Sequence, residues 1–202
     1  MKYGALALLA ACALLLFARC GAGGTPAGSA AATRGGAGFN GTDVMFLQMT
    51  LPHHAQAVRL AGLARERPVR PEVRTLAAAI ETTQRAEAAG MVARLRGWER
   101  PLRAPAGSHH GHAGAVPTTT DARVAALARV PDERFERAFL NLLIAHQDDA
   151  VELARMELGD GEDPWSLRLA EKIKASRTAQ IDRMLAMLGP RPPTPETPAP
   201  GK

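Results

Sequence analysis

The chain has 202 residues and a formal net charge of +5 at pH 7, and only 4% of its residues are aromatic. This composition does not favour a nucleic-acid surface, which needs aromatic side chains for base stacking beside its basic groups. Both cysteines, Cys12 and Cys20, lie near the amino terminus, so the rest of the chain has no cysteine for a disulfide, a redox pair or a zinc site. The remaining sequence is rich in Ala, Leu, Arg and Glu, which favours an all-α fold.

The first 20 residues have the features of an export signal. A lysine precedes an apolar run over residues 3–18, which has the length of a signal-peptide core and is short for a membrane span. We therefore expect an extracytoplasmic protein of the cell envelope that contacts the membrane only through this segment. Three alternatives remain for the anchor: a lipidated Cys20, a lipidated Cys12, or an uncleaved segment that ends at Arg19. Residues 21–38, rich in Gly, Ala, Thr and Ser, are expected to form a flexible linker.

Apolar residues at helical spacing predict a hairpin of two helices over residues 43–98. The first helix should begin at Asp43, with Thr42 as its N-cap, and end near Glu66. The second should begin at Pro71, because proline is favoured in the first turn of a helix.

A second hairpin is predicted over residues 132–189, and its second helix should begin at Pro164. The connecting loop, residues 99–131, is rich in Pro and Gly, although residues 121–128 are compatible with a short helix. The tail, residues 191–202, is rich in proline and is expected to be disordered.

The two hairpins match each other when the sequence is shifted by 93 positions without a gap. The aligned pairs include Phe46 with Phe139, His53 with His146, Ile80 with Ile173, Met91 with Met184, and Leu95 with Leu188. This pattern indicates an internal repeat. Because one hairpin cannot bury its apolar side alone, two facing hairpins predict a single four-helix bundle over residues 39–190.

Histidine and methionine supply the candidate metal ligands. The six histidines occur in three places: His53-His54 on the first predicted helix, His146 at the matching position of the third, and the loop residues His109, His110 and His112. Helical spacing places Met45, Met49 and His53 on one face of the first helix, and Gln84, Glu87 and Met91 on one face of the second. Thioether and imidazole ligands together suit copper, especially Cu(I), so copper is the expected cargo.

Each of these residues has a simpler alternative role. Methionine at helical spacing is commonly a core residue, and a buried histidine can serve a hydrogen-bond network instead of a metal. The loop histidines could bind Cu(II), Ni or Zn, or lie in a solvated loop without a specific role. Both interpretations stay open at the level of sequence.

Other chemistries lack support. A ferritin-type di-metal site needs Glu-x-x-His on two helices, and the chain contains no such pattern. Glu87 is a further candidate metal ligand. Five acidic residues of the predicted helices could line a metal site, although charged residues on bundle helices usually face water: Glu87, Asp148, Asp149, Glu152 and Glu157. No phosphate loop or nucleophile motif has the strand–turn–helix context that it requires, so we do not expect an enzyme.

The segment Asp43–Val58, DVMFLQMTLPHHAQAV, resembles the pattern D-x-x-F-x-x-M-x-x-x-H-H-x-x-A of the DUF305 family. The second predicted helix matches that family through Ile80, Gln84, Glu87 and Met91. The resemblance covers about residues 39–189. It implies a ferritin-like four-helix bundle, export or lipid anchoring, and the copper binding that is linked to some members.

The resemblance also implies a polar set in the first hairpin: Asp43, Met49, His53, His54, Gln84, Glu87 and Met91. The second hairpin departs from the family pattern, with Leu142, Gln147, Arg177 and Gln180 where Met, His, Gln and Glu are usual. A symmetric pair of sites is therefore not expected. If the bundle binds metal, the first hairpin together with His146 is the favoured place.

Two functions follow from the sequence. The first is extracytoplasmic binding, buffering or transfer of copper, which should weaken below about pH 6 as imidazoles protonate. The second is a non-catalytic structural or protein-interaction module of the cell envelope, whose His, Gln and Glu side chains form an internal network that fixes the register of the bundle.

Overall fold

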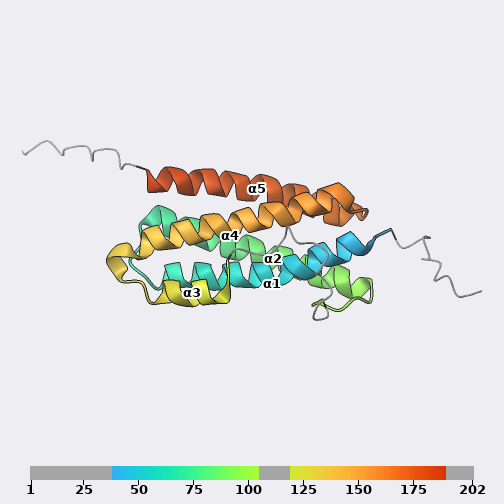
Figure 1. Cartoon of the computed structure of the whole chain (residues 1–202), viewed down its shortest axis with the longest axis horizontal. Coiled ribbons are helices and arrows are strands. Elements are labelled where there is room, and N and C mark those ends of the chain that lie inside the picture. Colours follow the sequence, from blue (N-terminus) through green and yellow to red (C-terminus); the bar gives the residue numbers. More distant parts are fainter. Residues whose placement is uncertain (1–37, 105–118, 190–202) are drawn as a thin grey trace, which may run out of the picture. The chain divides into compact units, whose positions relative to one another are not determined.

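The computed structural model describes residues 38–104 and 119–189. Their helices are α1 (Gly41–Arg65), α2 (Pro71–Gly97), α3 (Asp121–Ala128), α4 (Asp132–Asp160) and α5 (Pro164–Leu188) (Figure 1). The described ranges contain no strand, so the predicted all-α class is confirmed. The expected signal segment, most of the linker, the loop residues His109, His110 and His112, and the proline-rich tail lie outside the described residues.

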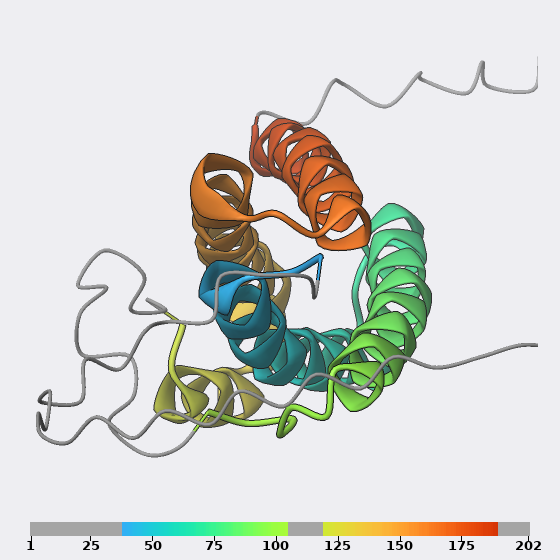
Figure 2. The same cartoon turned by 90° about the vertical axis from the view of Figure 1, so that its right-hand side faces the viewer.

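The four long helices form a bundle of two antiparallel hairpins. Helix α1 packs along α2 to form the first hairpin, and α4 packs along α5 to form the second. The two hairpins contact each other through α1 and α4, which lie side by side. Figure 2 looks along the bundle and shows the four helices around a common centre, with the short α3 outside it beside α1. None of the helices in the described ranges is long and apolar enough to cross a membrane.

The start of α1 corrects the predicted N-cap. Asn40, not Thr42, caps the helix, and its side-chain oxygen accepts hydrogen bonds from the backbone N–H groups of Thr42 (2.8 Å) and Asp43 (3.1 Å). In return, the Asp43 carboxylate accepts a hydrogen bond from the backbone N–H of Asn40 at 2.6 Å. This reciprocal pair is a capping box, and it lets α1 begin two residues earlier than expected.

The core consists of two apolar clusters, one toward each end of the bundle. The first cluster includes Leu60, Val73, Ile80, Phe135, Phe139, Leu143 and Met184. The second includes Phe46, Leu47, Met91, Leu95, Leu153, Leu169 and Ile173. Every long helix has buried polar residues between the two clusters, and these residues form the candidate site.

Candidate metal centre

A layer of seven buried polar side chains crosses the middle of the bundle. The polar layer consists of His53, His54, Gln84, Glu87, His146, Gln147 and Arg177. All four long helices contribute to it, because each helix places polar residues between the two apolar clusters. Buried polar groups are costly unless they find partners, so the contacts within this layer decide what it can do.

His53 and His146 form a stacked pair at the α1–α4 contact. Their ring centroids are 3.7 Å apart and the ring planes differ by 8°. Nε2 of His53 lies 3.0 Å from the backbone carbonyl oxygen of His146, so this nitrogen carries the proton and donates it. Nδ1 of neutral His53 is therefore a free lone pair, and it has no hydrogen-bond partner. Neither ring nitrogen of His146 makes a hydrogen bond of normal geometry, although the backbone of His53 lies close to this ring.

His54 belongs to a separate, charged half of the layer. Its Nε2 donates a hydrogen bond to Oε2 of Glu87 at 2.8 Å, and the Arg177 guanidinium donates to the same oxygen at 2.6 Å. Lys172 approaches the other oxygen of Glu87, with an N–O distance of 3.5 Å. Glu87, a candidate ligand, does not face water as most charged residues on bundle helices do, because α5 brings two cations to this carboxylate.

The neutral half of the layer is a chain of glutamines. Nε2 of Gln84 lies 3.5 Å from Oε1 of Gln147, and the amide of Gln147 donates in turn to Oε1 of Gln180. These contacts join α2, α4 and α5. The layer therefore holds one charged network, one neutral network and, between α1 and α4, a histidine pair with unused nitrogens.

The three imidazoles are held in their neutral form. Burial is the largest cause that lowers the pKa of His53 well below its usual value, and it also lowers the pKa of His54. Burial, together with the nearby His54 and Arg177, lowers the pKa of His146 to about 3. Metal ions compete with protons for imidazole nitrogen, so these rings need not lose a proton to bind a metal at neutral pH.

These donors fit a borderline or soft metal, yet they are not preassembled around one point. Imidazole lone pairs lie in the ring planes, so two parallel rings 3.7 Å apart cannot both point at one ion until a ring rotates. Accordingly, within residues 38–104 and 119–189, no three His, Cys, Asp or Glu side chains form a ready ligand set. A borderline or soft metal ion would bind most favourably to the unpartnered ring nitrogens of His53, His54 and His146.

Two open cavities that Pro52 lines also reach His53 and His54. One, of about 610 Å³, is lined by Met49, His53 and the start of α3. The other, of about 560 Å³, lies between α1 and α2 and is lined by His54 and Gln84. The half-buried Met49 thus shares a cavity with His53, as the helical spacing predicted.

Comparisons with known proteins identify the family to which this architecture belongs. The model of the family "Domain of unknown function (DUF305)" matches residues 43–188. The chain belongs to the DUF305 family. No curated protein matches this DUF305 chain.

Solved structures of the family have the same fold. A DUF305 fragment from Deinococcus radiodurans is 35% identical, with a TM-score of 0.65, over 74% of this chain and 96% of that one. A DUF305 protein from Streptomyces coelicolor, proposed to be secreted, is 27% identical, with a TM-score of 0.68, over 73% and 91% of the two chains. CopM in its Cu(I)-bound form is 29% identical, with a TM-score of 0.61, over 73% and 96%.

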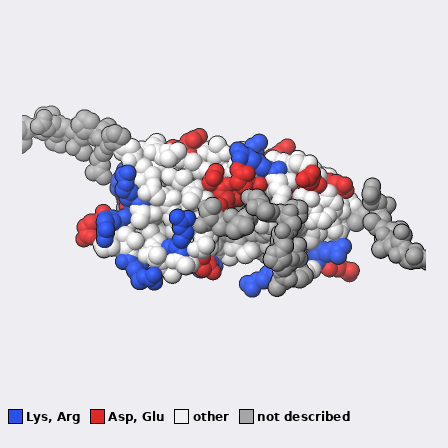
Figure 3. Space-filling model, in the orientation of Figure 1, with Lys and Arg blue, Asp and Glu red and all other residues white. Residues whose placement is uncertain are grey.

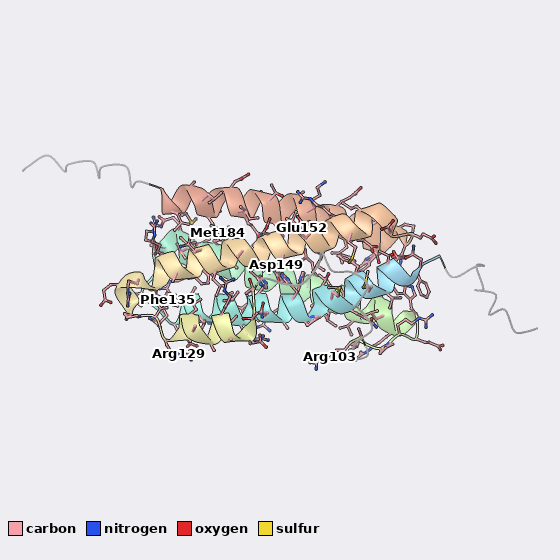
Figure 4. The ribbon with its side chains drawn as sticks, in the orientation of Figure 1. Arg103, Arg129, Phe135, Asp149, Glu152 and Met184 are labelled. Carbon is pink, nitrogen blue, oxygen red and sulfur yellow. The ribbon has the colours of Figure 1, made fainter. Side chains whose placement is uncertain are left out.

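The other predicted ligands of this DUF305 chain lie elsewhere. Met91 is fully buried and packs in the second apolar cluster. Met45 is buried on α1, one turn before Met49. On the outside of α4, Asp148 and Glu152 are exposed, as expected. Figure 4 labels Glu152 on this helix, and Figure 3 shows charges of both signs interspersed over the same face.

A second polar cluster was not predicted. Glu157 of α4, expected to face water, is fully buried at the end of the bundle, where α1 and α5 begin. Burial and the nearby carboxylate of Asp43 raise the pKa of Glu157 to about 9, so it holds a proton at neutral pH. Asp43 itself accepts hydrogen bonds from the backbone N–H groups of Glu162 (3.1 Å) and Asp163 (2.9 Å). Helical spacing offered no signal for this contact, because the partners of Asp43 are far away in sequence; only the family resemblance had included Asp43 in a polar set.

Proposed function

We propose that this DUF305 protein binds copper outside the cytoplasm and buffers it or passes it on. The observation that carries the proposal is the buried pair of neutral imidazoles, His53 and His146, which have unpartnered ring nitrogens. His53 also lines an open cavity together with Met49. Nitrogen and thioether donors without a free carboxylate suit Cu(I) better than hard cations. The similarity to CopM, which was solved with Cu(I), Cu(II) and Ag bound, supports the same assignment.

We rank the candidate ligands by whether their donor atoms are free of ion pairs and hydrogen bonds. His53, His146 and Met49 are the first choice, because their donor atoms are not committed to an ion pair. His54 can contribute its unpartnered Nδ1 while its Nε2 stays on Glu87. Glu87 is held by His54 and Arg177 at Oε2, with Lys172 at 3.5 Å from Oε1, and would act through His54, not as a ligand. Rotation of one stacked ring would bring the nitrogens toward a common ion.

The proposal also includes the location of the protein in the cell and the origin of its internal repeat. The apolar amino-terminal run supports export, with lipid anchoring at Cys20 or Cys12 or an uncleaved segment as the alternatives. His53 stacks on its own counterpart under the 93-position shift, which supports descent of the two hairpins from one unit.

A competitive Cu(I) titration under reductant tests the function. The full chain should carry Cys12→Ser and Cys20→Ser, so that the amino-terminal thiols add no binding. We expect saturable binding that is lost in His53→Ala/His146→Ala and retained when His109, His110 and His112 are replaced by Ala. Binding that follows the loop histidines would move the site, and no binding at all would refute the proposal.

The charged network and the neutral network of the polar layer favour a second candidate function, a structural or protein-interaction module. The Gln84–Gln147–Gln180 chain and the His54–Glu87–Arg177 network each join three helices, so they can fix the register of the bundle without a metal. For this function, His53→Ala should lower the melting temperature of the metal-free protein by several degrees while copper changes nothing.

A further inference from the structure

The short helix α3 borders the cavity that reaches His53. This cavity, of about 610 Å³, is lined on α1 by Met49 and His53 and on the other side by residues 119–121, where α3 begins. Figure 2 shows α3 outside the four-helix bundle, beside α1. A metal ion that reaches His53 through this cavity therefore passes beside the start of α3.

One carboxylate fastens the start of α3 to α1. Oδ1 of Asp121 accepts hydrogen bonds from Nε2 of Gln56 at 2.9 Å and from Nη2 of Arg59 at 2.6 Å. Gln56 and Arg59 line the same cavity as Asp121, so this set of contacts, the Asp121 clasp, lies in the cavity wall. The Arg59 and Asp121 side chains are 52% and 80% exposed. Ion pairs between exposed side chains are weak and are screened by salt.

The remainder of α3 is anchored mainly by two apolar side chains. Val124 and Leu127 are buried in the first apolar cluster, whereas the other residues of this eight-residue helix are exposed. Just before the helix, the backbone N–H of Thr119 donates to the Asp149 carboxylate of α4 at 3.1 Å. A segment that buries so little apolar surface can open locally while the bundle stays folded. Breaking the Asp121 clasp frees the first turn of α3 from α1.

We propose that the Asp121 clasp controls how fast copper enters and leaves the cavity at His53. The inference rests on the proposed function and adds a control of rate to it. His53 and Met49 supply the donor atoms, and the clasp sets how often the cavity wall beside them opens. The clasp joins α3 to α1 without using these donor atoms. It therefore changes the rate constants of binding and release by one common factor and leaves Kd unchanged.

Stopped-flow transfer of Cu(I) to a chromogenic chelator in excess, under reductant, measures the release rate, and a competitive titration measures Kd. Both use the full chain with its two cysteines replaced by Ser. Asp121→Ala removes a negative charge from the cavity wall, and Arg59→Gln removes a positive one. A faster release in both variants therefore cannot come from the electrostatic effect of one charge on the ion.

Asp132→Ala is the matched control. Asp132 is also an exposed aspartate at the first position of a helix, and it also pairs with an arginine, Arg67, at 2.6 Å. It begins α4 and is not among the residues that line the cavity at His53. A general loosening of a helix start would therefore affect this variant as it affects Asp121→Ala.

We expect Asp121→Ala and Arg59→Gln to release Cu(I) about fivefold faster than the parent, with Kd within about twofold, and Asp132→Ala to match the parent. Added salt should speed release from the parent more than from Asp121→Ala, because it screens the Arg59–Asp121 pair.

Release from Asp121→Ala at the parent rate would overturn the inference and leave copper binding intact. A large change of Kd in Asp121→Ala would overturn it as well, because Asp121 would then act on the bound ion. Failure of the parent chain to bind Cu(I) would instead refute the proposed function, and the inference with it.

Discussion

The buried carboxyl group of Glu157 makes a specific prediction about stability and pH. In the folded protein its pKa is raised to about 9 by burial and by Asp43, whereas a glutamate in an unfolded chain titrates near 4.3. Between these values the folded state keeps a proton that the unfolded state releases. Stability from this group is thus fully present below about pH 4 and is lost as the pH rises toward 9.

The magnitude follows from linkage. One proton held only by the folded state changes the free energy of unfolding by about 1.4 kcal/mol per pH unit. From pH 5 to pH 8 this group alone should cost about 4 kcal/mol, a large part of the stability of an ordinary domain. Glu157→Gln keeps a hydrogen-bond donor for Asp43 but has no proton to lose, so its stability should not show this slope.

Urea unfolding of the metal-free protein at pH 5, 6, 7 and 8 measures the effect. The free energy of unfolding of Glu157→Gln relative to the parent should rise steadily over this range, because every other titrating group is shared by the two proteins. Glu152→Gln, at an exposed position of the same helix, is the control and should give a constant difference. A constant difference for Glu157→Gln as well would show that Glu157 is ionised in the folded state, and the reasoning would fail.

Three further results are expected. His146, with a pKa of about 3 when folded and about 6.5 when unfolded, should cost about 2 kcal/mol of stability as the pH falls from 6.5 to 5, and His146→Gln should remove that loss in acid unfolding curves. Gly161→Ala should destabilise by about 2 kcal/mol in urea, because its new Cβ would lie 2.6 Å from the backbone oxygen of Glu157, whereas Gly159→Ala meets nothing and should be harmless. Copper binding by the bundle should persist at pH 5, below the limit expected from sequence, because burial keeps these imidazoles neutral; a titration that loses affinity below pH 6 would point to the loop histidines instead.

The helices were predictable because their signals are local. Proline at the start of α2 and of α5, and the apolar spacing between, gave their starts correctly, and residues 121–128 do form α3. The N-cap of α1 was missed because Asn40 and Thr42 both have capping side chains, and the choice depends on Asn40 also contacting Asp43. The pairing of His53 with His146 followed from the shift between the hairpins, which is a non-local signal that sequence does carry.

The burial of the ionisable side chains was not predictable from helical spacing. Glu87, Glu157 and Arg177 sit on helices where charged residues normally face water, and each is buried because another helix supplies its partner. Those partners are far away in sequence: Arg177 is 90 positions from Glu87. Composition and helical spacing describe one helix at a time, so they cannot predict contacts between side chains on different helices. The stacking of the imidazoles, which decides whether they can share an ion, is likewise a tertiary property.

The way the helices pack against each other also predicts which side of the bundle opens first. The closest approaches join α1 to α2, α4 to α5 and α1 to α4, while α2 meets α5 mainly through side chains such as the Glu87–Arg177 and Arg94–Asp163 pairs. Local opening should therefore begin on the α2–α5 side, before α1 and α4 separate. Amide hydrogens of α2 and α5 would then exchange with solvent faster than those of α1 and α4, so the histidine pair lies on the slowest-opening side of the protein.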